Sequence, residues 1–306
     1  MNLKAKNQTE LYGFKNVFRE LCLLYNKDKL PSKILLSGQK GIGKCTFAYH
    51  LINYALSQDE ENSYDIKRFI INENNKSFKL ILNETNPNFS LVDVKPEKKS
   101  IDIDQIRNLI NLMNKSSFNK KPRFILIDNI EFLNVSSVNA LLKILEEPNE
   151  NIYFILIHNN SKILETLKSR CLNFKLFLKN KETLEITEKL LKTNISDKIN
   201  LDLINYYSTP GNIYRLVDFF EKLEIQLKNL ELKEFLELII KQKTYKKDIN
   251  IKNIIYEFIE FFLIKKNMFT KSNYYNYFIR QMDTVKKFNL DEDSFFIEFR
   301  SKILNG

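Results

Sequence analysis

The hydrophobic and polar positions of the chain follow two patterns, which change near residue 178. Before this point, short apolar runs such as residues 34–36 and 124–127 alternate with longer amphipathic stretches. These runs are too short for buried helices and are followed by turn residues, so they predict parallel strands buried on both faces. Strands that alternate with helices predict an α/β domain with a parallel sheet over residues 1–178.

The individual elements of this domain follow from the spacing of its apolar residues. Predicted strands cover residues 34–36, 89–92, 124–127 and 153–157. A last strand-like run begins with Ser169-Arg170-Cys171 and ends at residue 178. Apolar residues at intervals of three and four predict helices between them. These are an entry helix with Phe14, Val17, Phe18, Leu21 and Cys22, a helix over residues 47–56, one that follows the cap Asp102, one from the N-cap Ser136 to a stop at Pro148, and one over residues 162–168.

Beyond residue 178 the pattern is helical throughout. Residues 179–220 predict a small helical domain that is interrupted at Ser208-Thr-Pro-Gly211. Residues 221–306 carry long apolar and aromatic stripes, which predict an all-α domain. These stripes bring no catalytic groups of their own, so they suit a surface that joins subunits.

Composition narrows the class of protein. The chain is 43% hydrophobic and 28% charged, as ordinary globular proteins are, and no apolar run is long enough to cross a bilayer. Its start has no apolar leader, so we expect a cytoplasmic protein. Three cysteines in unrelated contexts allow neither a disulfide framework nor a four-cysteine zinc site, and we assign no role to His50. The net charge of +10 is spread without a basic block and leaves direct DNA contact open.

A glycine-rich stretch follows the first predicted strand. Gly38, Gly43 and Lys44 have the G-x-x-x-x-G-K spacing of a P-loop, in which backbone N–H groups and a helix N-terminus surround a phosphate. Gly41, Cys45 and Thr46 complete the predicted loop, and Lys44 is expected to reach the β- and γ-phosphates. The residue after the lysine is normally Ser or Thr. Cys45 stands there instead, and a neutral thiol is a poor ligand for Mg²⁺. A glycine-rich turn that binds nothing is the alternative.

Polar residues follow two later strands. Asp128 ends the strand at residues 124–127, where a carboxylate can hold Mg²⁺ through water, and Glu131 is placed to orient a water molecule. The alternative is an acidic loop that caps the next helix. Asn159 follows the strand at residues 153–157 and can sense a γ-phosphate, unless His158-Asn159-Asn160 is only a turn. No set of metal ligands is predicted.

Two further motifs resemble the clamp-loader branch of the AAA+ ATPases. The helix Asn139-Ala-Leu-Leu-Lys-Ile-Leu-Glu-Glu-Pro148 is similar to the sequence after the acidic strand in that branch, and Ser169-Arg170-Cys171 is similar to its Ser-Arg-Cys motif. Leu30-Pro31 before the first strand also matches. The resemblance covers residues 1–215 and implies an AAA+ domain, a helical lid and a C-terminal collar. It also implies that Arg170 acts as an arginine finger, catalytic in the neighbouring subunit's nucleotide site.

Where the chain departs from the motor subunits of that branch, its pattern resembles that of the delta-prime subunits. These subunits belong to bacterial DNA polymerase III and do not act as motors. Cys45 replaces the hydroxyl residue, and residues 57–100 have no cysteine for the motor subunit's zinc module. Tyr214 stands where the motor's sensor arginine follows Gly211, although Arg215 comes next. The resemblance implies that ATP and Mg²⁺ are bound weakly if at all, that zinc is absent, and that Asp128 and Glu131 are vestigial.

This resemblance also implies partners. They are the motor ATPase and delta subunits of a hetero-pentamer, together with the sliding clamp and primed DNA that the complex handles, and no membrane. One alternative stays open at this point, because it uses the same fold. It is an active motor subunit of the gamma or tau kind, or another DNA-associated AAA+ ATPase.

Overall fold

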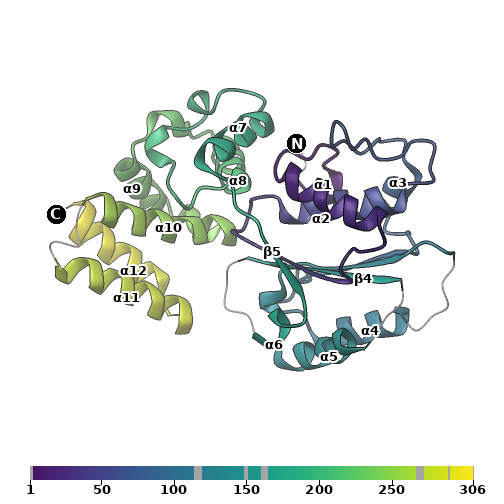
Figure 1. The fold of residues 1–306 in the computed structure, drawn as a ribbon. Coiled ribbons are helices and arrows are strands. Elements are labelled where there is room, and N and C mark those ends of the chain that lie inside the picture. Colours follow the sequence, from purple (N-terminus) through teal and green to yellow (C-terminus); the bar gives the residue numbers. More distant parts are fainter. Residues whose placement is uncertain are drawn as a thin grey trace. The chain divides into compact units, whose positions relative to one another are not determined.

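The computed structural model describes residues 3–113, 119–147, 151–159, 165–266, 272–288 and 290–305. The chain divides into two compact units, Met1–Glu182 and Thr183–Gly306. The first unit contains a five-stranded sheet in the order β2-β3-β4-β1-β5, and all neighbouring strands are parallel (Figure 1). Its strands are β1 (Lys33–Ser37), β2 (Phe89–Val92), β3 (Arg123–Ile127), β4 (Ile152–His158) and β5 (Leu172–Lys175).

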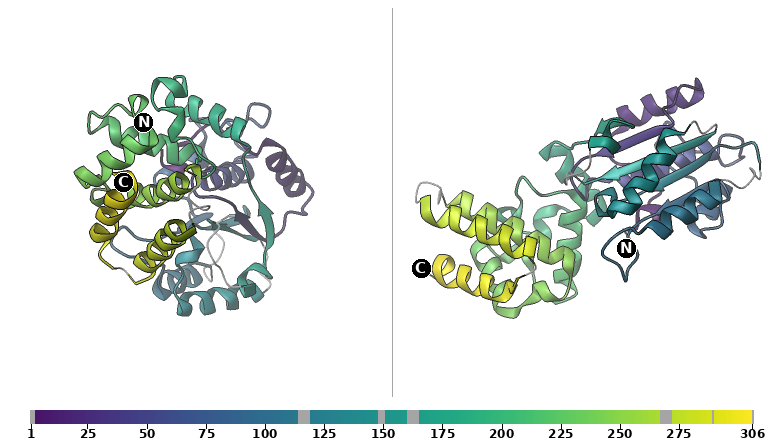
Figure 2. Two further views of the ribbon diagram at one scale, coloured as in Figure 1. Left: turned by 90° about the vertical axis from the view of Figure 1, so that its left-hand side faces the viewer. Right: turned by 90° about the horizontal axis from the view of Figure 1, so that it is seen from below.

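Helices cover both faces of this sheet, as Figures 1 and 2 show. Alternate residues of a strand point to opposite faces, so Ile34 and Leu36 pack in one core while Leu35 packs in the other. The first core is shared with α1 (Lys15–Asn26), α2 (Lys44–Leu56) and α3 (Lys76–Leu82), and the second with α4 (Ile103–Met113), α5 (Val135–Glu146) and α6 (Glu165–Lys168). Burial on both faces explains why the strands appear as continuous apolar runs. The predicted α/β parallel sheet is confirmed.

Some predicted boundaries are wrong. Asn134, not Ser136, is the N-cap of α5, because its side-chain oxygen accepts the backbone N–H of Ser137 at 2.8 Å. β5 stops at Lys175 instead of continuing to residue 178, since its partner β1 ends at Ser37 and offers only one more carbonyl. The predicted stop at Pro148, the amide of Asn160 and the first part of the helix predicted at residues 162–168 lie outside the described residues.

The described part of the second unit is helical. Its main helices are α7 (Asn180–Leu191), which begins at the boundary, α8 (Pro210–Glu221), α9 (Leu232–Gln242), α10 (Ile249–Lys265), α11 (Ser272–Phe288) and α12 (Glu292–Phe299). α8 begins inside the predicted interruption, with Thr209 as its N-cap and Pro210 in its first turn. Phe220 of α8, Phe235 of α9 and Phe258 of α10 share one core. The division of this region into a lid at 179–220 and a collar at 221–306 stays a prediction.

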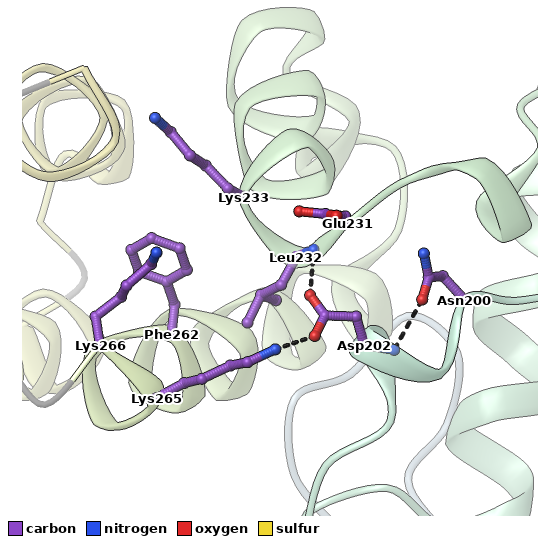
Figure 3. Close-up of a pocket in the computed structure, with 8 residues that line it drawn as sticks. All are labelled: Asn200, Asp202, Glu231, Leu232, Lys233, Phe262, Lys265 and Lys266. Atoms are coloured by element: carbon purple, nitrogen blue, oxygen red, sulfur yellow. Dashed lines mark hydrogen bonds and ion pairs between the residues drawn. The ribbon is translucent and has the colours of Figure 1, made fainter.

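A hollow of about 370 Å³ lies in this unit beside the short helix Leu201–Leu203 (Figure 3). Asp202 joins three elements there. One of its carboxylate oxygens accepts the backbone N–H of Leu232 at 3.0 Å, at the start of α9, and the other pairs with Lys265 at the end of α10. The backbone N–H of Asp202 donates to the side chain of Asn200 at 2.9 Å. The Asp202 carboxylate therefore already has its partners within the fold.

Among the described residues, no helix has the length and apolar character that crossing a membrane requires.

His50, to which the sequence assigns no role, is a structural residue. It is fully buried, with Nδ1 2.9 Å from the Tyr64 hydroxyl and Nε2 3.2 Å from the carbonyl of Gln8. Burial lowers the pKa of its imidazole from 6.5 to about 4. The ring is therefore neutral in the folded protein at neutral pH, and it links α2 to the segments at Gln8 and Tyr64.

The burial of His50 predicts a pH dependence of stability. Because its pKa is lower in the folded than in the unfolded chain, the unfolded chain binds the extra proton between about pH 6.5 and pH 4. His50 should therefore make stability fall as the pH decreases through this window, by up to about 1.4 kcal/mol per pH unit. A His50→Gln variant should lose this component. The check is urea unfolding of both proteins from pH 7.5 to 4.5. A constant difference in unfolding free energy across the window would contradict the prediction.

Candidate nucleotide-binding site

The predicted site residues gather at the carboxyl edge of the sheet. β1 leads into the glycine-rich loop and α2, while Asp128 follows β3 and Asn159 follows β4. β4 lies between β1 and β3 in the sheet. Since parallel strands end at the same edge, these three segments meet there, which is where open α/β sheets bind ligands.

The loop has the backbone that phosphate binding requires. Gly41 and Gly43 have φ angles of 88° and 99°, which side-chain-bearing residues rarely adopt. Gly38 is required for a different reason, because a Cβ atom there would lie 2.3 Å from the backbone oxygen of Leu176, just after β5. Thr46 lies half-buried in the first turn of α2. The N-terminus of α2 follows the loop, so its free N–H groups favour an anion at this place.

Lys44 is the cation of the site. Its side chain is almost fully buried, and Nζ donates to the carbonyls of Gly38 and Gln39 at 2.9 and 2.6 Å. Burial lowers the pKa of this ammonium to about 8, while the acidic side chains of Asp128 and Glu131 oppose that shift. The lysine is thus held by the loop's own carbonyls, beside the space that phosphates would take.

Cys45 and Asp128 occupy the part of the site where a P-loop protein holds magnesium. Burial and the nearby Asp128 carboxylate raise the pKa of the Cys45 thiol well above its ordinary value, so the thiol stays protonated beside that carboxylate. Burial and the neighbouring Asp93 raise the pKa of Asp128 to about 6. A neutral thiol is a poor substitute for the oxygen ligand that Mg²⁺ prefers. The residues fit phosphate oxygens better than they fit this ion.

Asn159 connects the loops that follow β3 and β4. Its side-chain Nδ2 donates to Glu131 Oε1 and to Asn129 Oδ1, both at 2.8 Å. Its backbone N–H lies 3.4 Å from Glu131 Oε2. Asn129, with φ of 56°, donates in turn to the Asp93 carboxylate at 2.8 Å. Asn159 therefore orients Glu131.

Asn129 and Asp93 are members of the site that the sequence analysis missed. A signal for Asp93 was present, because it directly follows the predicted strand at residues 89–92, as Asp128 follows the next one. Asn129 has only a weak signal, the tolerance of asparagine for left-handed turns. The network that they form with Asn159 shows that three strand ends contribute to the site.

Arg170 makes its hydrogen bonds elsewhere. It follows α6, and its guanidinium bonds to Glu146 of α5 and to the carbonyl of Thr166 rather than to the loop or Asp128. Tyr214 and Arg215 lie on α8, in the second unit. In the described part of the chain, no cluster of three or more histidine, cysteine or acidic side chains could hold a metal ion.

The sheet order, the P-loop after β1 and the acidic residue after β3 define an AAA+ P-loop domain. Residues 14–180 match the family described as DNA polymerase III, delta subunit, and the chain belongs to this family. The predicted resemblance to delta-prime subunits of this polymerase is confirmed as well, by the relatives that the chain matches.

Three relatives illustrate the similarity. The chain is 28% identical over 248 residues to the DNA polymerase III subunit delta' of Buchnera aphidicola subsp. Baizongia pistaciae, which covers 77% of this chain and 70% of the relative. It is 32% identical over 138 residues to the delta' subunit of Pseudomonas aeruginosa, with 45% and 40% covered. The DNA polymerase III subunit gamma of Buchnera aphidicola subsp. Schizaphis graminum is 27% identical over 236 residues, with 75% and 62% covered.

The thiol at Cys45 predicts weak use of Mg²⁺ and nucleotide by the isolated chain. Cys45→Ser supplies a hydroxyl oxygen and should tighten Mg²⁺-dependent ATP binding about tenfold, which corresponds to about 1.4 kcal/mol. Lys44→Ala should weaken binding, and Cys171→Ser, outside the site, should change nothing. Titration with a fluorescent ATP analogue, with and without Mg²⁺, measures these effects. Brisk Mg²⁺-dependent hydrolysis by the unaltered chain that Lys44→Ala abolishes would mean that the site is active.

Proposed function

We propose that this chain is a non-motor subunit of the DNA polymerase III clamp loader, the assembly that opens a ring-shaped sliding clamp and places it on primed DNA. The observation that supports the non-motor role is the protonated Cys45 thiol beside the Asp128 carboxylate, in place of the usual hydroxyl. A motor subunit needs that carboxylate and a hydroxyl oxygen for Mg²⁺. ATP with Mg²⁺ is therefore bound weakly by this chain, and its own hydrolysis is slow or absent.

The proposed partners are those of such a loader. They are motor ATPase subunits and a delta subunit in a hetero-pentamer, and the clamp and primed DNA that the complex holds in the cytoplasm. An active motor subunit is the alternative that the sequence left open. Similarity to gamma subunits reflects a shared fold, and the family match together with the delta' relatives favours the non-motor role.

Arg170 is the residue that we propose to act in a neighbouring subunit. It lies two residues before β5, which is an edge strand of the sheet. Its side chain is 32% exposed, and its hydrogen bonds leave its own P-loop untouched. In a ring of subunits, an arginine at this edge can stabilise charge on a phosphoryl group that the adjacent subunit transfers. We propose this in-trans role as the catalytic contribution of the chain.

The proposed role of Arg170 can be tested in a reconstituted clamp loader. Arg170→Ala should leave the chain folded and assembled, yet slow hydrolysis at the neighbouring site by about 10³-fold or more, the effect typical of arginine fingers. Arg170→Lys should not restore the rate, because an ammonium lacks the planar fork. Arg107→Ala, which removes another exposed arginine paired with an acidic residue, is the matched control. Normal ATP hydrolysis and clamp loading by the Arg170→Ala complex would disprove the role.

Residues 221–306 are proposed to form the collar that joins the subunits. Several large apolar side chains of α11, α12 and their connection are exposed, among them Phe288 at 63%, Ile297 at 56% and Leu290 at 49%. An interface with another subunit would cover such side chains. α8 shares its core with α9 and α10, so a cut at residue 221 would divide that core. A deletion that removes the collar is therefore best placed at the boundary of the two units.

Truncation tests the collar proposal. A chain that ends at Glu182 keeps the sheet and the two cores that cover its faces, so it should fold but no longer join the complex. Ile297→Asp in the full chain should weaken assembly without unfolding the chain, because its side chain is exposed. Circular dichroism checks folding, and gel filtration with the partner subunits checks assembly. Incorporation of the truncated chain into the complex at the normal level would refute the proposal.

A further inference from the structure

The guanidinium of Arg170 is held by acceptors from two helices. Glu146, the last residue of α5, accepts hydrogen bonds at a single carboxylate oxygen from Nε, at 3.0 Å, and from Nη2. The carbonyl of Thr166 in α6 accepts from Nη1 at 2.8 Å. An ionised acceptor and a planar donor group make such bonds stronger and more directional than those of neutral groups.

The backbone that carries these groups is fixed by a core. Leu167 of α6 is 2% exposed and packs in the same cluster as Leu141 and Leu145 of α5. Cys171 packs against this cluster from the other side of Arg170. Ser169 Oγ donates at 3.1 Å to the carbonyl of Thr166, the acceptor that Arg170 also uses. The residues on both sides of Arg170 therefore fix its backbone, and only the two long side chains remain to be ordered.

The number of donors shows which part of the guanidinium stays available. An arginine side chain has five N–H groups, and Glu146 and Thr166 occupy three of them. One N–H remains on Nη1 and one on Nη2. These two groups belong to the terminal part of the side chain, and together they can bind two oxygens of one phosphoryl group.

We propose that Glu146, with the Thr166 carbonyl, positions Arg170 so that its terminal N–H groups are presented to the nucleotide of the adjacent subunit. This inference rests on the proposed in-trans role of Arg170. Glu146 touches no nucleotide in this scheme, so it is a positioning residue. Glu146 accepts only from Nε and from one N–H of Nη2. Arg170 can therefore bind a phosphoryl group without releasing Glu146. The same contact links the last turn of α5, which ends just before Glu147, to the Ser-Arg-Cys motif.

The test uses the complete, reconstituted clamp loader with variants of this chain. Glu146→Ala should lower kcat for ATP hydrolysis on the order of 10-fold to 100-fold at the site that Arg170 reaches, and leave the KM for ATP unchanged. Glu146→Gln keeps an oxygen acceptor and should restore most of the rate. A chain with both Glu146→Ala and Arg170→Ala should be no slower than one with Arg170→Ala alone. Glu165→Gln, which removes another exposed acidic partner in α6, should have no effect.

The outcomes distinguish a failure of the Glu146 positioning role from a failure of the proposed function. If Arg170→Ala slows the complex but Glu146→Ala does not, the positioning role is wrong and the in-trans role stands. If Glu146→Ala speeds hydrolysis, Glu146 sequesters Arg170, and the positioning role is again wrong. If Arg170→Ala has no effect, both ideas fail. The Glu146 side chain is 55% exposed, so its variants should fold, and gel filtration of each complex confirms assembly.

Discussion

Parallel strands end at one edge of a sheet, and every part of the candidate site depends on this constraint. The chain leaves β1 into the glycine-rich loop, leaves β3 at Asp128 and leaves β4 at Asn159. Because β4 lies between β1 and β3, the Asn159 side chain can reach Glu131 in the loop after β3. A strand in another position would separate these groups. The strand order therefore determines which side chains lie close enough to act together in the site.

Within this frame, the site satisfies most of its own charges. The Lys44 ammonium donates to two loop carbonyls, the Asp128 carboxylate accepts the backbone N–H of Asn129, and Glu131 accepts from the Asn159 amide. Arg170, on the other helical face, is likewise paired with a carboxylate of its own chain. A site whose charges are paired within the chain needs no ligand to neutralise them.

Much of this could be predicted from the sequence because strands buried on both faces appear as unbroken apolar runs, and the bounds predicted for β2 match the structure. Local pattern could not decide between Asn134 and Ser136, two good caps two residues apart, since only the hydrogen bond to Ser137 distinguishes them. It also missed α3, a short helix in a polar stretch, which is held by its Asn75 cap and the packing of Phe78. The approach of Cys45 to Asp128 and the hydrogen bonds from Arg170 to Glu146 bring together distant parts of the chain, so they could be seen only in the fold.

Gly38 has a structural role that does not depend on a bound phosphate. A side chain at this position would collide with the backbone just beyond β5, whether or not a phosphate is ever bound. The fold therefore requires this glycine independently of any nucleotide. The same does not hold for residue 45, where the structure accommodates a cysteine. The presence of this glycine therefore says little about nucleotide use, and the residue after the lysine is the more informative position to examine.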